Sequence, residues 1–182
     1  AAAASSREGK SAEQERAQFE VQLQSLQERA AMEAGDSSAH VSLDLARRTI
    51  RLRRQPRFVP RGDSLVDPEA EEPALAALAA TLRVCNRLLR QRGQEELRAY
   101  IEGLTAAEDA ASIELAKRRC AVIKAVVCRA MREAEGAGAE GASPPASRMA
   151  ERRFEDLFAC RGYGGRGGVG KGDTKIRLRV ML

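Results

Sequence analysis

Two amphipathic helical patterns that alternate with strand patterns constrain the fold of this 182-residue chain more than any other feature. The segments 67–92 and 109–135 each carry an apolar stripe at helical spacing, formed by Leu75, Leu78, Leu82, Cys85 and Leu89 in the first and by Ala116, Cys120, Ile123, Val127 and Met131 in the second. Residues 96–102 and 174–182 instead alternate apolar and polar side chains, as half-buried strands do. Helices that connect strands of one sheet form right-handed crossovers, so we expect an α+β fold with both helices on one face of the sheet.

Weaker strand patterns complete the expected order of elements. Residues 41–59 alternate in two places, at Val41, Leu43 and Leu45 and again at Ile50 and Leu52. Residues 154–161 fit a strand, or a short helical turn followed by a strand. Gly103 is expected to end the strand that begins near residue 96. The sequence thus predicts a two-layer β-α-β-α-β-β sandwich with a mixed sheet.

A further amphipathic helix is expected ahead of this sandwich, because residues 11–34 contain neither Gly nor Pro and Gly35 follows them. This helix has a narrow apolar seam that consists of Ala12, Phe19, Leu23, Leu26 and Ala30. The seam fits either pairing with another helix in a short coiled coil or packing on the domain. We expect an N-terminal helical segment at 1–40 and a domain at 41–182, with a flexible insertion at 136–147.

The charge distribution leaves two interpretations open. Lys and Arg exceed Asp and Glu by 31 to 26, and seven arginines lie between Arg47 and Arg61 with no acid among them. These arginines fit either a patch for phosphates or acidic partners or an exposed strand edge kept soluble by its charge. The strand edge is favoured, since aromatic interleaving is nearly missing, with Phe58 alone among the arginines. The segment RGYGGRGGVG at 161–170 is similar to an RGG-type RNA-binding segment, but a glycine-rich hairpin loop is the favoured interpretation. Nucleic acid is therefore not the expected partner.

The sequence gives little support for catalysis. A GxxxxGK pattern at 165–171 lacks the Ser or Thr that binds Mg²⁺ in a P-loop, and no helix follows it, so we expect no nucleotide. His40 is the only histidine and the four cysteines form no CxxC pair, so neither a catalytic triad nor a zinc site is expected. Cys85 and Cys120 are expected to be buried free thiols. The prediction is a protein that is not an enzyme and has no cofactor or metal.

Four short motifs are more specific when they are taken together and in order. They are Gly103-Leu104-Thr105-Ala106, Leu115-Ala116-Lys117-Arg118-Arg119-Cys120, Gly162-Tyr163-Gly164 and Asp173-Thr174-Lys175-Ile176-Arg177. With these motifs, residues 41–182 resemble the OmpA-like domain family, the peptidoglycan-binding modules of OmpA, MotB and peptidoglycan-associated lipoproteins. The family's first strand, serine-containing loop and proline-started helix correspond to residues 56–82 in this comparison.

The resemblance implies a noncatalytic module that holds the diaminopimelate side chain of a peptidoglycan stem peptide between the strand-end loop and the second helix. Arg119 and Thr105 match the family's arginine and threonine. In such a pocket an arginine binds the ligand carboxylate while an aspartate binds its ammonium group. The family's aspartate is Ala106 here and its helix asparagine is Ser112, so the pocket is partly degenerate. Glu108 and Asp109 are the two candidate acids to replace the missing aspartate, and Asp109 is counted with Arg119, Thr105 and Ser112 among the expected ligand-binding residues.

Two functions are consistent with these features. The first is an anchoring or interaction module that binds peptidoglycan through Arg119 and its neighbours, in the cell envelope or on the periplasmic side of a membrane if the protein is bacterial. The alternative is a structural scaffold subunit of a protein assembly with no glycan ligand, in which helix 11–34 contacts a protein partner. Binding that depends on Asp109 favours the first, and sensitivity to Leu23 and Leu26 favours the second.

Overall fold

A computed structural model describes residues 17–18, 20–33, 35–136, 154–165, 169–170 and 173–181 of the chain. Its centre is a five-stranded sheet with the order β1-β2-β5-β3-β4. The first four strands in this order pair antiparallel, whereas β3 and β4 run parallel. The strands are β1 (Val41–Asp44), β2 (Thr49–Leu52), β3 (Arg98–Leu104), β4 (Phe158–Tyr163) and β5 (Lys175–Met181). The predicted α+β fold with a mixed sheet is confirmed.

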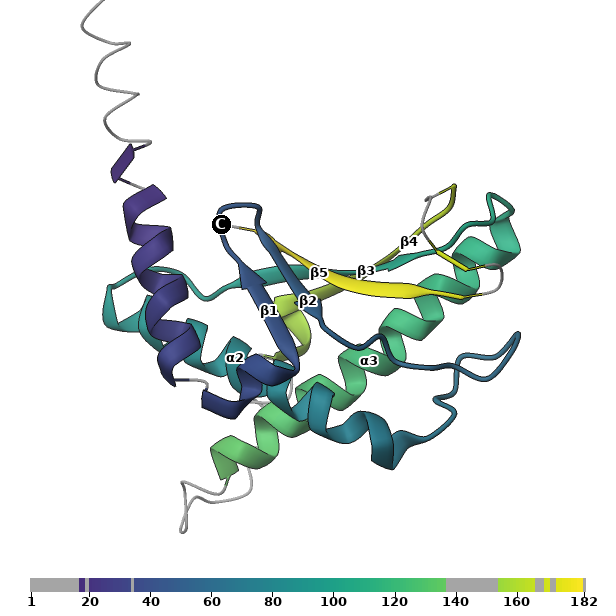
Figure 1. The fold of residues 1–182 in the computed structure, drawn as a ribbon, viewed down its shortest axis with the longest axis horizontal. Coiled ribbons are helices and arrows are strands. Elements are labelled where there is room, and N and C mark those ends of the chain that lie inside the picture. The colour runs from purple at the N-terminus through teal and green to yellow at the C-terminus, as the bar shows by residue number, and fades with distance from the viewer. Residues whose placement is uncertain are drawn as a thin grey trace, which may run out of the picture.

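Two long helices cover one face of the sheet, as the sequence predicts (Figure 1). They are α2 (Pro68–Gln91) and α3 (Ala110–Gly136), and a short 3-10 helix, η1 (Gly35–Ala39), precedes β1. The side chain of Asp67 caps α2 by accepting a hydrogen bond from the Ala70 N–H at 3.0 Å, and Pro68 follows at the first helical position. Gly93, with φ +67°, lets the chain leave the helix.

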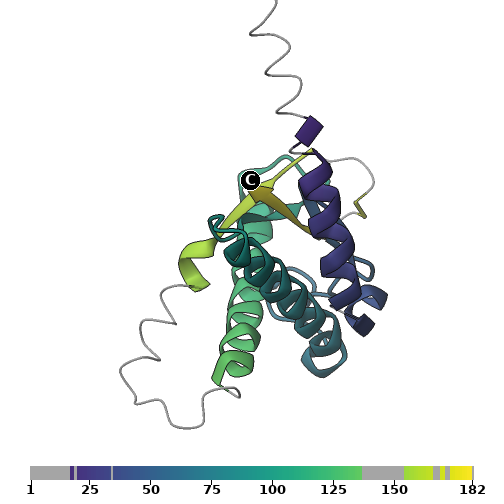
Figure 2. The same cartoon turned by 90° about the vertical axis from the view of Figure 1, so that its left-hand side faces the viewer.

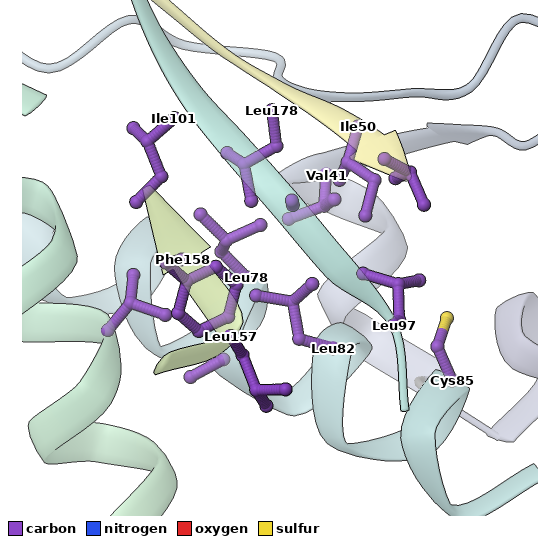
Figure 3. Close-up of a cluster of buried hydrophobic side chains, with 14 of the residues drawn as sticks. Val41, Ile50, Leu78, Leu82, Cys85, Leu97, Ile101, Leu157, Phe158 and Leu178 are labelled. Atoms are coloured by element: carbon purple, nitrogen blue, oxygen red, sulfur yellow. The ribbon is translucent and has the colours of Figure 1, made fainter. Parts of the chain in front are cut away.

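The core lies between the sheet and these two helices. Apolar side chains from β2, β3 and β5 point toward those of α2, as Figure 3 shows for Ile50, Ile101, Leu178, Leu78 and Leu82. All five are fully buried. The alternation along β5 explains this arrangement, because every second residue of a strand faces the same side of the sheet. The predicted apolar stripes therefore meet the predicted buried strand faces.

The segment 41–66 differs from the expectation in detail. The two alternating stretches form a hairpin of β1 and β2, joined by a turn at 45–48 in which Arg48 has a φ of 54°. Residues 56–66, which the resemblance matched to a first strand and loop, form an irregular loop closed by a single bridge between Phe58 and Leu65. Pro56 and Pro60 lack the N–H groups that a sheet strand would donate, which accounts for the difference.

The N-terminal helix lies on the domain, which is one of the two arrangements left open by its sequence. Leu23, Leu26 and Ala30 are buried in the same apolar cluster as the sheet and α2. The Leu45 N–H donates a hydrogen bond to the side chain of Gln27 at 2.9 Å, which ties this helix to the end of β1. Residues 11–16, Phe19 and residues 137–147 of the predicted insertion lie outside the described residues, and the division at residue 40 stays a prediction.

Glycines allow α3 to pack directly on the backbone of β3 and β4. A Cβ atom placed on Gly103 would lie 2.6 Å from the Ala116 carbonyl oxygen, and one on Gly162 would overlap the Ile113 carbonyl oxygen. Gly103 is thus inside β3, which runs to Leu104, and the prediction that it ends the strand is wrong. It is needed because the helix approaches too closely for a side chain. This contact fixes the position of α3 and of Arg119 on it.

Candidate functional site around Arg119

The guanidinium group of Arg119 is buried and holds together three segments of the chain. Only 2% of the residue is exposed. Its Nε donates a hydrogen bond to the Gly62 carbonyl oxygen at 2.9 Å, its Nη2 to the Val59 carbonyl oxygen at 3.2 Å, and its Nη1 to the Thr174 hydroxyl at 2.8 Å. The ring of Phe58 lies beneath it, with its centroid 5.0 Å from the guanidinium carbon. These acceptors of Arg119 belong to the chain itself, and two of them lie in the loop 58–62.

Two carboxylates compensate the buried charge of Arg119. Burial lowers the pKa of its guanidinium group, and the negative charges of Asp173 and Asp63 act in the opposite direction. Asp63 also forms an ion pair with Arg118 at 3.8 Å. A guanidinium group stays protonated throughout the physiological range, so Arg119 carries its charge inside this site. Asp63 lies in the loop before α2, and Asp173 lies just before β5.

Thr105 has a local structural role at the end of β3. It is buried, and its N–H donates a hydrogen bond to the Tyr163 carbonyl oxygen at 2.9 Å. Its hydroxyl accepts a hydrogen bond from the Ala107 N–H at 3.4 Å. Both contacts shape the turn that leads from β3 to α3.

Asp109 and Ser112 form the N-terminal cap of α3. The Asp109 carboxylate accepts a hydrogen bond from the Ser112 N–H at 2.8 Å, and the hydrogen bonds from Ser112 lower the pKa of Asp109. Arg119 lies ten positions after Asp109 in the sequence, which corresponds to about 15 Å along the helix axis. The structure therefore does not bring Asp109 to Arg119, because the unpaired N–H groups at the start of α3 hold the carboxylate there.

The hydrogen bonds of Arg119 connect α3 to the loop 58–62 and to Thr174. Among the described residues, no group of three or more His, Cys, Asp and Glu side chains is placed to hold a metal ion. The cysteines are free, as predicted for Cys85 and Cys120, and burial raises the pKa of Cys85 to about 12 and that of Cys128 to about 11. Such thiols are poor nucleophiles at neutral pH.

The partners of Arg119 were missed by sequence reasoning. Two of them are main-chain carbonyl groups at Val59 and Gly62, whose position depends on the path of the loop and not on their side chains. Thr174 lies in a matched motif, but the motif does not indicate that its hydroxyl accepts from Arg119. The one available signal was Asp63 and Asp173, two acids that each follow a glycine in the sequence.

No protein-family model and no curated protein matches the sequence. Among solved structures, the chain is similar to the OmpA-like domain of FopA1 from Francisella tularensis subsp. tularensis SCHU S4, with 10% sequence identity and a TM-score of 0.42 over 78% of this chain and 77% of that one. This is a distant similarity of fold. In the described part of the chain, no helix is both long and apolar enough to cross a membrane.

Proposed function

We propose that the chain is a noncatalytic interaction module, a scaffold of the OmpA-like type in which Arg119 stabilises the fold and does not bind a ligand. The observation that carries this proposal is the burial of the guanidinium group among acceptors of its own chain. A ligand carboxylate would have to displace the loop 58–62 before reaching Arg119. Hydrogen bonds to a charged group are worth about 1.5–3 kcal/mol each, so this displacement is costly.

The proposal predicts that loss of Arg119 affects stability and not glycan binding. In Arg119→Ala, the acceptors at Val59, Gly62 and Thr174 lose their donor, and we expect the free energy of unfolding to fall by about 3 kcal/mol. Urea unfolding followed by circular dichroism measures this change. Arg118→Ala is the matched control, since it removes an exposed arginine from the same helix and should cost under about 1 kcal/mol.

Peptidoglycan binding is the second candidate function, and one observation favours it. Asp63 and Asp173 lie close enough to Arg119 to influence its pKa, so an acid and an arginine are present together even though Ala106 replaces the family's aspartate. If the loop 58–62 moved aside, these groups would offer an arginine for the carboxylate and an acid for the ammonium group of diaminopimelate. This function would place the protein in a cell envelope.

A binding experiment separates the two candidates. We expect no heat of binding for diaminopimelate at millimolar concentration by calorimetry, and no retention of the protein on purified peptidoglycan sacculi. Binding by the unaltered protein that is lost in Asp63→Asn with Asp173→Asn, while Asp109→Asn retains it, would establish the second candidate and overturn the first. These variants avoid Arg119, whose replacement also disturbs the fold.

A further inference from the structure

The face of the sheet opposite α2 and α3 carries a concentration of positive charge. Both helices lie on one side of the strands (Figure 2), and the residues that alternate with the core residues point to the other side. Six cationic side chains share this open face, and we call them the basic face: Arg51, Arg98, Arg161, Lys175, Arg177 and Arg179. Five of them are exposed, and the exception is the partly buried Arg177.

The basic face has little negative charge to neutralise it. Glu102 is the acid at its centre, but this carboxylate is only 1% exposed and accepts a hydrogen bond from Arg177 Nε at 2.6 Å. Asp44 lies at the β1 edge, where it forms an ion pair with Arg47 at 3.7 Å. The remaining cations of the face therefore present their charge to solvent, and an anionic partner is the complementary one.

Two tyrosines lie among these cations. Tyr100 on β3 and Tyr163 on β4 point to the open face, and the guanidinium carbon of Arg161 lies 3.5 Å from the centroid of the Tyr100 ring. A hydrogen bond with Tyr163 raises the pKa of Arg161. Guanidinium planes and aromatic rings are the surfaces on which unpaired bases stack.

The strand register arranges these groups in rows. Arg51, Arg177, Glu102 and Arg161 are successive partners across four strands, and Arg179 and Tyr100 are partners in the adjacent row. Neighbouring strands are about 4.8 Å apart, and alternate residues along one strand about 7 Å. Cations and stacking groups thus alternate over the open face at distances that a single-stranded backbone with splayed bases spans.

We propose that the basic face binds single-stranded nucleic acid, with its arginines and lysine on the phosphates and its Arg161–Tyr100 stack beneath a base. The sequence did not favour this partner because Phe58 is the only aromatic residue among the arginines at 47–61. The fold supplies the aromatic residues from β3 and β4, which are distant in sequence. The inference is independent of the function proposed for Arg119, which lies on the other side of the sheet.

Fluorescence anisotropy with a labelled 20-nucleotide oligouridylate tests the proposal. The variant Arg51→Ala/Lys175→Ala/Arg179→Ala should bind at least tenfold more weakly at low salt, and the slope of log affinity against log salt should fall by about 2. The matched control is Arg90→Ala/Lys117→Ala/Arg129→Ala, which removes the same charge from the exposed surfaces of α2 and α3 and should leave the affinity unchanged.

Tyr100→Leu separates base stacking from charge alone. We expect it to weaken oligouridylate binding severalfold and to leave the binding of polyphosphate unchanged. Failure of the unaltered protein to bind oligouridylate at 50 mM salt would overturn the proposal, as would an equal loss of affinity in the control variant. Binding of polyphosphate or of vesicles containing phosphatidylserine as tightly as oligouridylate, with no effect of Tyr100→Leu, would also overturn it.

Discussion

Arg119 on α3 and Asp109 at its N-terminal cap each form hydrogen bonds with backbone groups that lack a partner in a helix or strand. Arg119 donates to carbonyl groups of a loop that has no strand partner for them, and Asp109 accepts from N–H groups that have no partner at the start of α3. Both are charged residues whose partners belong to the chain itself. A charged side chain in a family-like motif therefore has to be judged by its acceptors and donors before a ligand is assigned to it.

The cap formed by Asp109 should make stability depend on pH. The pKa of this carboxyl is lowered in the folded state, so its contribution is fully present above its unfolded value of about 4 and is lost as the pH falls through the folded value. We expect Asp109→Ala to be less stable than the unaltered protein at pH 7 and equal to it near pH 2, as measured by urea unfolding. Asp109→Asn keeps the hydrogen-bond acceptor without the charge, and should retain most of the stability at pH 7 without this pH dependence. A constant difference between Asp109→Ala and the unaltered protein at every pH would contradict the prediction.

At the scale of elements, the approach of α3 to the sheet depends on glycine. Gly103→Ala would place a methyl group 2.6 Å from the Ala116 carbonyl oxygen and 2.9 Å from the Cys120 sulfur. Because the first of these neighbours is backbone, we expect the free energy of unfolding to fall by about 1–3 kcal/mol. Thermal unfolding checks this. Gly62→Ala is the control, since its new methyl group would meet Val59 at an ordinary 3.5 Å, and a similar loss in both variants would show that close packing is not the cause.

Elements with strong periodicity could be predicted from the sequence, and those defined by long-range contacts could not. The stripes of α2 and α3 and the alternation of β5 depend on local spacing, which the sequence displays. The loop 56–66 depends on Arg119, some 60 residues away, for the partners of two of its carbonyl groups. A local motif was enough to single out Arg119. Its burial under that loop depends on long-range contacts, so no local pattern could predict it.

At the scale of the whole molecule, the N-terminal helix and the sheet share one core. Leu26 is fully buried in the cluster that includes Leu45 and Leu89. We expect Leu26→Ala to lower the free energy of unfolding by about 2–4 kcal/mol, measured by urea unfolding. Val21→Ala is the control because Val21 is 67% exposed, and it should have little effect. A different result would contradict this prediction. If Leu26→Ala changed self-association in analytical ultracentrifugation and left the free energy of unfolding unchanged, the apolar seam of the N-terminal helix would pack against a helix of a partner.

The order of the strands bears on how the protein acquires its structure during synthesis. Among the described helices and strands β5 comes last in sequence, yet it lies in the middle of the sheet, between β2 and β3. Until β5 has emerged from the ribosome, the hairpin of β1 and β2 has no neighbour to join it to β3 and β4. The nascent chain therefore exposes two unpaired inner strand edges, one on β2 and one on β3, until β5 is available, and chaperones that shield such edges would matter most in this interval.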